Sequence, residues 1–410
     1  MNNKAVKVFL SVILVLVVVI GGVAIGMTVK NGRQPIEPAA APVFGKKEQP
    51  TEAPTEVPTE KPTEASAPVT LKMLSVGDNL IHDGIYEQAK KRAGGNGYDF
   101  SYCYARVKSI VEAADIATIN QETIVAKSYA PSGYPLFNSP QELGEEVVKT
   151  GFDVVSLANN HMLDKTAKGL QEAIDFWDAS GIVRTGAYKD EADLNKVEYI
   201  EKNGLKIGLI GITQYTNGLS LPGGSKLRYI LTTHEATIER KIKAAKENCD
   251  VVLVNVHWGS EYTTTPSADQ RNLAKKMAQW GANVIIGHHP HVIQPVEWIE
   301  NADGTRTLVA YSLGNFISQQ NTAARVIGGM LHYSVSKDFS TGKVIVSDVL
   351  FETIVTHYVS GSHDVQIYPL SQYTDALAKK QASRIKQSDF SVAYIENFVK
   401  EVIPAEFLSA

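Results

Sequence analysis

The chain has 410 residues, a formal net charge of −4 and 44% hydrophobic residues. This balance argues against a nucleic-acid-binding protein, because such domains carry a clear excess of Lys and Arg. The only cysteines, Cys103 and Cys249, are too few for a disulfide framework. Two buried thiols are the simpler interpretation, and a single disulfide is the alternative.

The first predicted element is a membrane segment. Val8 to Val29 contains no charged residue and is long enough to cross a hydrocarbon core of about 30 Å. We therefore predict residues 1–30 as a cytoplasmic stub followed by a transmembrane signal-anchor. A cleaved signal peptide is the alternative, although its apolar region is usually shorter. The short N-terminal stub favours a single pass through the cell membrane, with the C-terminal domain outside the cytoplasm.

Residues 31–68 form the second predicted segment. Four copies of Pro-Thr-Glu recur at a spacing of four between Pro50 and Glu64. Regular prolines prevent helices and strand ladders and favour an extended, solvated chain. We predict a disordered linker that acts as a stalk and spans on the order of 100 Å. An adhesive or O-glycosylated tract is the alternative.

Residues 69–360 alternate between strand and helix patterns, which predicts an α/β domain with a largely parallel sheet. The predicted strands are Leu71 to Val76, Ile116 to Ile119, Val154 to Leu157, Leu205 to Ile212, Val251 to Val256 and Val284 to Ile286. The predicted helices lie around Tyr102 to Ala114, Gln141 to Lys149, Ala167 to Ala179, Glu235 to Glu247 and Ser267 to Trp280.

Turn signals also predict three antiparallel hairpins. They cover Val197 to Ile210, Val296 to Tyr311 and Met330 to Leu350. We expect these hairpins to build a second sheet that packs on the first, with the last hairpin completing it. Residues 361–410 are predicted as a C-terminal helical extension, because Ser388 to Val402 has an amphipathic pattern.

The residues capable of chemistry follow the predicted strands, and in open α/β sheets the ligand crevice lies beyond the carboxyl ends of the strands. The candidates are Asp78, Asn120, Glu122, Asn160, His161, His257, His288, His289 and His291. We therefore expect these side chains to converge. Their mixture of oxygen and imidazole donors suits Mn, Zn or Fe better than Ca or Mg.

The histidine cluster is the strongest indication of a metal site, since imidazole is the commonest metal-binding side chain. We expect an extended chain around Pro290, so that His289 and His291 point to the same side. His257 follows a nearly continuous apolar strand, where an imidazole needs a partner. Asp78 and Glu122 taken alone are weaker signals. His82 either reaches the site through its loop or lies on the surface.

In this order, Gly77-Asp78, Asn120-x-Glu122, Asn159-Asn160-His161, His257-Trp258-Gly259, Gly287-x-His289-Pro290-His291 and Tyr311 to Phe316 resemble the CapA family. That family is associated with bacterial capsule and poly-γ-glutamate synthesis and is similar to the calcineurin-like metallophosphoesterases. The resemblance covers roughly Leu71 to Phe316. It implies a layered αββα sandwich with a two-metal site.

The resemblance also implies roles for individual residues. Asp78 and His291 would bind one metal, Glu122 would bridge, and Asn160, His257 and His289 would bind the second. His161 would be the acid beside the leaving group, with His82 and Asn120 as further candidates for a ligand or substrate contact. The chain departs from metallophosphoesterases at Leu80, where they usually place His, and at Glu122, where they place Asp.

Two functions follow as hypotheses. One is an extracytoplasmic metal-dependent hydrolase that uses two divalent transition-metal ions to cleave a phosphoester or an amide bond. The other is a non-catalytic accessory protein that exports or tethers an anionic polymer. In both hypotheses the partners are an anionic capsule polymer or its precursor, the membrane and other membrane components of polymer synthesis. The sequence leaves open whether the chain is an enzyme.

Overall fold

The computed structural model describes residues 68–359 and 364–409. The predicted membrane segment and almost all of the predicted linker therefore lie outside the described residues. Within the described ranges, no helix combines the length and the apolar character needed to span a membrane.

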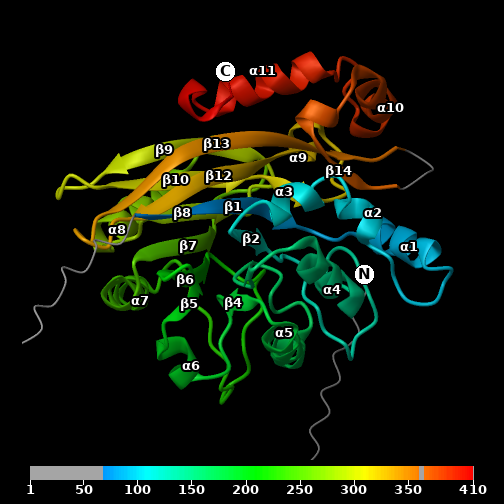
Figure 1. Cartoon of the computed structure of the whole chain (residues 1–410). Helices are drawn as coiled ribbons and strands as arrows, with labels where there is room; N and C mark the ends of the chain where they lie inside the picture. Colours follow the sequence, from blue (N-terminus) through cyan, green and yellow to red (C-terminus); the bar gives the residue numbers. More distant parts are fainter. Residues whose placement is uncertain (1–67, 360–363, 410) are drawn as a thin grey trace, which may run out of the picture. The chain divides into compact units, whose positions relative to one another are not determined.

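The described chain folds into two β-sheets with helices around them (Figure 1). The eight-stranded sheet has the order β14-β13-β12-β1-β2-β3-β4, with β11 paired to β1. Its strands are β1 (Val69–Asn79), β2 (Ile116–Asn120), β3 (Val154–Ser156), β4 (Val183–Thr185), β11 (Asn315–Ile317), β12 (Ile327–Lys337), β13 (Val344–His357) and β14 (Gln366–Pro369).

The six-stranded sheet has the order β5-β6-β7-β8-β10-β9. Its strands are β5 (Glu198–Lys202), β6 (Leu205–Thr213), β7 (Val251–His257), β8 (Val284–His288), β9 (Ile293–Glu300) and β10 (Arg306–Leu313). Strands β1 and β12 contact β8, β9 and β10 of this sheet, so the two sheets lie face to face.

Parallel strands occur in both sheets, whereas the sequence predicted one largely parallel sheet and a second sheet built from hairpins. Strands β1 to β4 are parallel in one sheet, and β6, β7, β8 and β10 are parallel in the other. The β12–β13 hairpin extends the sheet of β1 instead of completing the other. The predicted two-sheet α/β fold is confirmed, but the predicted division into one parallel sheet and one hairpin sheet is wrong. Both sheets are buried, so strands of either sheet have similar apolar patterns.

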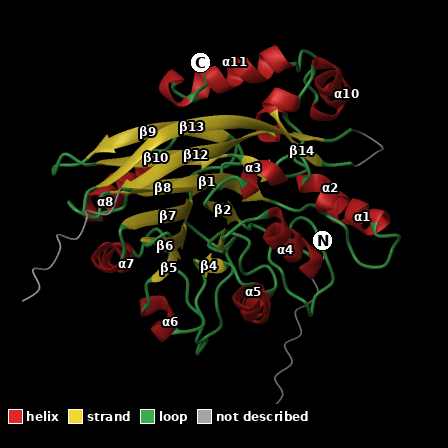
Figure 2. Ribbon diagram, in the orientation of Figure 1, coloured by secondary structure: helices red, strands yellow, loops and turns green. Residues whose placement is uncertain are grey.

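The helices cover the outer faces and edges of the sheets (Figure 2). Helix α5 packs on β4, α7 on β6 and β7, α8 on β10, and α11 on β9. The helices are α1 (Asp83–Arg92), α2 (Ser101–Tyr104), α3 (Lys108–Glu112), α4 (Gln141–Thr150), α5 (Thr166–Ser180), α6 (Glu191–Asn195), α7 (Glu235–Asn248), α8 (Ala268–Trp280), α9 (Ala323–Val326), α10 (Asp375–Ile385) and α11 (Val392–Val402).

One predicted helix is broken. The range Tyr102 to Ala114 forms the two short helices α2 and α3, separated by a turn. Tyr104 is buried at the end of α2, and its hydroxyl donates to Asn79 Oδ1 at 2.7 Å. This buried hydrogen bond ties the end of α2 to β1, and the chain turns directly after it.

The core explains why β7 is apolar from Val251 to Val254. Val251 and Leu253 belong to the large apolar cluster that includes residues of both sheets, whereas Val252, Val254 and Val256 pack in a second cluster that includes residues of α7 and α8. Successive side chains of a strand point to opposite faces. A strand covered on both faces therefore has no polar alternation, and its polar residues at the carboxyl end become conspicuous.

Candidate functional site

The candidate site lies where the carboxyl ends of parallel strands from both sheets meet. The eight-stranded sheet supplies oxygen donors, with Asp78 in β1 and Glu122 just after β2. The six-stranded sheet supplies imidazoles, with His257 at the end of β7 and two further histidines, His289 and His291, just after β8. All five side chains are buried. Neither sheet alone provides the whole set.

Asp78 is surrounded by donors. Its Oδ1 accepts a hydrogen bond from Asn120 Nδ2 at 2.8 Å and lies 3.4 Å from His288 Nδ1. Its Oδ2 accepts from the His289 amide at 3.3 Å and lies 3.2 Å from His291 Nδ1. Burial alone would raise the pKa of Asp78, but His288 and His291 outweigh burial and hold the pKa well below its usual range. Asp78 is therefore ionised.

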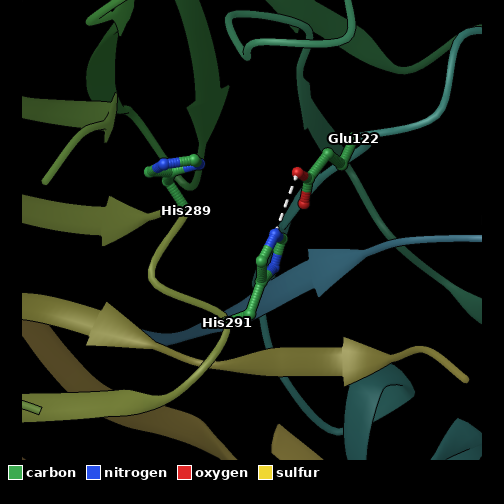
Figure 3. Close-up of side chains that lie close together, drawn as sticks. All are labelled: Glu122, His289 and His291. Atoms are coloured by element: carbon green, nitrogen blue, oxygen red, sulfur yellow. Dashed lines mark ion pairs between the residues drawn. The ribbon is translucent and has the colours of Figure 1, made fainter. Parts of the chain in front are cut away.

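Glu122, unlike Asp78, lies in an environment poor in hydrogen-bond donors. Within the described residues, neither of its buried carboxylate oxygens accepts a hydrogen bond. Its Oε1 lies 3.7 Å from His257 Nε2 and 3.6 Å from His291 Nε2, and Figure 3 shows the carboxylate directed at the His291 ring. Burial raises the pKa of Glu122 well above its usual range, although His291 opposes this effect. Buried oxygens without donors are costly unless a cation or proton satisfies them.

The donors form two overlapping groups of metal-ligand type, and Glu122 belongs to both. One group joins Glu122 with His289 and His291, and the other joins Glu122 with Asp78 and His257. Within each group the candidate ligand atoms lie within 4.8 Å of one another. The donor set and the orphaned Glu122 oxygens fit divalent metal binding, with Glu122 between the two groups.

The loop after β8 departs from the expected extended geometry. His289 has φ +99° and His291 has φ +57°, so both residues adopt the left-handed conformation, which is uncommon for residues other than Gly. The extended interpretation of this segment is therefore wrong. The bend nevertheless keeps the ring centroids of His289 and His291 5.7 Å apart, and the centroids of His289 and His257 are 4.8 Å apart.

Just before this loop, at Gly287, the backbone of β8 packs closely against its neighbours. A Cβ added to Gly287 would lie 1.9 Å from Tyr311 O and 2.6 Å from Trp258 Nε1. Gly287 thus lets β8 approach β10 closely. The indole Nε1 of Trp258 donates to the same Tyr311 carbonyl at 3.0 Å, so the contact leaves no room for a side chain.

Two of the imidazoles in the ligand groups, those of His257 and His289, are held neutral. Burial lowers the pKa of His257 well below its usual range, and burial together with His291 lowers the pKa of His289 to about 3. Neutral imidazole is the form that binds metals. His289 Nε2 hydrogen-bonds to the hydroxyl of Tyr215, a residue that the sequence did not indicate.

His161 lies in an adjoining cluster rather than in either ligand group. Its Nδ1 donates to Asp164 Oδ2 at 2.8 Å, and its ring meets Phe137 edge-on with centroids 4.7 Å apart. Asn160 connects this cluster to the ligand groups, because its Oδ1 accepts from His257 Nε2 at 2.8 Å and its Nδ2 donates to Asn217 at 3.2 Å.

The remaining candidates lie at the edges of the site. Asn120 contacts Asp78 and also His257 Nδ1 at 3.4 Å. His82 accepts a hydrogen bond from the Gln319 amide at 3.2 Å and belongs to neither ligand group. Two residues that the family resemblance leaves without a role also contact the site: His288 contacts Asp78, and the Oδ1 of Asn315 accepts from His291 Nδ1 at 3.1 Å.

The family model and two relatives that match this chain by sequence are all capsule or PGA synthesis proteins. The family model of the bacterial capsule synthesis protein PGA_cap matches residues 72–320. The capsule biosynthesis protein CapA of Bacillus anthracis is 31% identical over 277 residues, covering 64% of this chain and 63% of that protein. The PGA biosynthesis protein CapA of Bacillus subtilis (strain 168) is 30% identical over 247 residues, covering 59% and 63%. The matches thus span just under two thirds of these relatives' length.

Solved structures resemble the chain more distantly. A phosphatase from Mycoplasma pneumoniae gives a TM-score of 0.42 at 14% identity, covering 70% of this chain and 94% of that one. The NAD nucleotidase NadN of Haemophilus influenzae gives 0.42 at 14% identity, covering 82% and 60%. Likeness at this level carries no conclusion about activity.

Proposed function

Because the chain belongs to the PGA_cap family of bacterial capsule synthesis proteins, we propose that it acts in the synthesis of a capsule or poly-γ-glutamate-type polymer as a metal-dependent hydrolase. The apolar segment Val8 to Val29 supports an anchor in the cell membrane, with the folded domain outside the cytoplasm. The substrate would be a phosphoester or an amide bond of the anionic polymer or its precursor.

The sharing of Glu122 is the observation that carries this proposal. The buried carboxylate lies between two groups of ligand atoms and lacks hydrogen-bond donors within the described residues. Asp78 and His257 would hold one ion and His289 and His291 the other. This pairing differs from the one that the family resemblance implies, in which His291 binds the same ion as Asp78. Two divalent ions, Mn, Zn or Fe, would supply Lewis-acid activation of a substrate oxygen and of water at neutral pH.

The protein's own side chains account for the proton transfer. Asp164 accepts from His161 Nδ1, which fixes the tautomer and leaves Nε2 to exchange a proton with the leaving group. Phe137 packs against the ring and restricts its rotation. Asn160 hydrogen-bonds to His257 and to Asn217, and Asn217 Nδ2 lies in contact with the His161 ring, 3.4 Å from Nδ1, so the acid and the ligand groups keep a fixed separation.

Elemental analysis of the purified full-length chain tests the metal site. We expect about two ions per chain in the wild type and a large loss in Glu122→Gln. His332→Gln is the matched control, since His332 pairs with Glu352 and belongs to neither ligand group. A folded wild type that takes up no Mn, Zn or Fe would overturn the proposal.

Hydrolysis assays then test the chemistry. The probes are a phosphoester and a γ-glutamyl oligomer. The metal-loaded wild type should cleave one of them, and His161→Gln with unchanged metal content should cleave neither. Full metal content without cleavage of the polymer or its precursors would instead support the non-catalytic role in export or tethering.

A further inference from the structure

Beyond the imidazole side of the site lies an arginine that no carboxylate of the described chain neutralises. Arg325 is in the short helix α9, and its side chain is partly exposed. Its guanidinium carbon lies 3.3 Å from the centroid of the Tyr262 ring, so the group lies against the aromatic face. Among residues 68–359 and 364–409, Arg325 has no ion-pair partner.

Two connections hold Arg325 next to the candidate metal ligands. Asn315 contacts His291 through its Oδ1 at 3.1 Å and donates from Nδ2 to the Arg325 carbonyl at 2.9 Å. Tyr262, on which the guanidinium stacks, has its ring centroid 6.2 Å from that of His291. The backbone of α9 and the aromatic platform are therefore both tied to His291.

The platform itself is held in an unusual conformation. Tyr262 has φ +66°, and its amide donates to the Pro290 carbonyl at 2.7 Å. Left-handed backbone at a bulky residue is rare and persists only when the surroundings hold it. The hydrogen bond fastens the Tyr262 loop to the loop that carries His289 and His291. Arg325 and the ligand groups therefore keep a fixed relation to each other.

We propose that Arg325, supported by Tyr262, is a carboxylate-binding subsite that selects anionic polymer. Guanidinium binds carboxylate through two parallel hydrogen bonds, and stacking on an aromatic face leaves its in-plane N–H donors free. A γ-linked glutamate chain presents one free α-carboxylate on each residue. One carboxylate on Arg325 would place a neighbouring bond of the chain beside the ligand groups. This assignment rests on the proposed function and names its substrate class.

The nearby acidic residue does not compete for Arg325. Glu261 precedes Tyr262, but its Oε1 lies 3.9 Å from His291 Nε2 and forms no ion pair with Arg325 within the described chain. Among the described residues, no acidic side chain therefore occupies the position that an external anion would take on Arg325.

Binding measurements on the full-length chain test the subsite without relying on catalysis. The probes are a synthetic γ-linked glutamate oligomer and the same oligomer with its α-carboxylates amidated. Arg325→Gln should weaken binding of the charged oligomer by about tenfold or more, because it removes a charge-assisted bidentate contact. The amidated oligomer should bind equally to both proteins, and Arg325→Lys should fall between them.

The matched control is Arg306→Gln. Arg306 also stacks on an aromatic ring, that of Trp298 at 3.8 Å, but it begins β10 and so lies at the opposite end of that strand from the site. It should bind like the wild type. Equal affinity of Arg325→Gln and wild type for the charged oligomer, or equal loss for both oligomers, would overturn the subsite. Metal content measured on the same samples reports separately on the proposed function.

Discussion

Replacing Gly77 with Ala should damage the junction that carries Asp78. A Cβ at this position would lie 1.9 Å from the Gly314 carbonyl oxygen and 2.9 Å from its carbon. Both neighbours are backbone atoms, so no flexible side chain can move aside. The strand and the Gly314 segment would have to separate by more than an ångström, since ordinary contacts begin near 3.4 Å.

The expected loss of stability in Gly77→Ala has two sources. Overpacking a well-filled site costs about 1–3 kcal/mol. Separation also breaks the hydrogen bond from the Asp78 amide to Gly314 O, 2.9 Å long in the structure, and an unsatisfied buried group costs about 1–3 kcal/mol. We expect Gly77→Ala to lower the free energy of unfolding by about 2–6 kcal/mol. Denaturant titration in the presence of a chelator measures this change without a contribution from bound metal.

Gly223→Ala is the matched control. A Cβ on Gly223 meets no atom within 4 Å, and its φ is not in the left-handed region. This variant should unfold within about 1 kcal/mol of the wild type, and a small stabilisation is expected because Ala restricts the unfolded chain. A Gly77→Ala protein within about 0.5 kcal/mol of wild type would refute the close-approach argument.

Three further predictions concern individual side chains. Burial lowers the pKa of His291, but three neighbouring carboxylates, Glu122, Asp78 and Glu261, outweigh burial and raise it to about 9. A metal must displace this proton, so metal affinity should increase from about pH 7 to about pH 9, and a flat competition titration would contradict this. Asp164→Asn should lower kcat about tenfold or more with unchanged metal content, because it replaces the charged acceptor that orients His161 with a neutral amide oxygen. Unchanged kinetics would show that this charge is dispensable. Burial raises the pKa of Cys103 to about 12, so a thiol reagent should label the half-buried Cys249 first, as peptide mass analysis would show.

The sequence predicts the convergence of the site well, and the reason is geometric. Asp78, Glu122 and His257 each lie at or just after the carboxyl end of a parallel strand, and such ends meet at one edge of a sheet. The division of these strands between two sheets was not predictable. A strand such as β7 is apolar on both faces whether it is covered by helices or by another sheet.

The residues around the ligand groups and the local backbone conformation are harder to predict from the sequence. Tyr215 and Asn217 lie in the loop after β6, outside any periodic pattern, and only the fold brings them to the histidines. The left-handed backbone at His289 and His291 was missed because residues other than Gly seldom adopt it. A cluster of histidines around one proline therefore indicated the chemistry but not the direction of the side chains.

The split between an oxygen-donating sheet and an imidazole-donating sheet has a consequence for folding. A metal ion held by both sets of donors would act as a crosslink across the interface between the sheets. Because the complete donor set exists only after the sheets have docked, the ion would bind the native state and not either sheet alone. At a free concentration 100 times its dissociation constant, such an ion would add about 2.7 kcal/mol to the stability of the native state. The cohesion of the sandwich would then depend on metal supply.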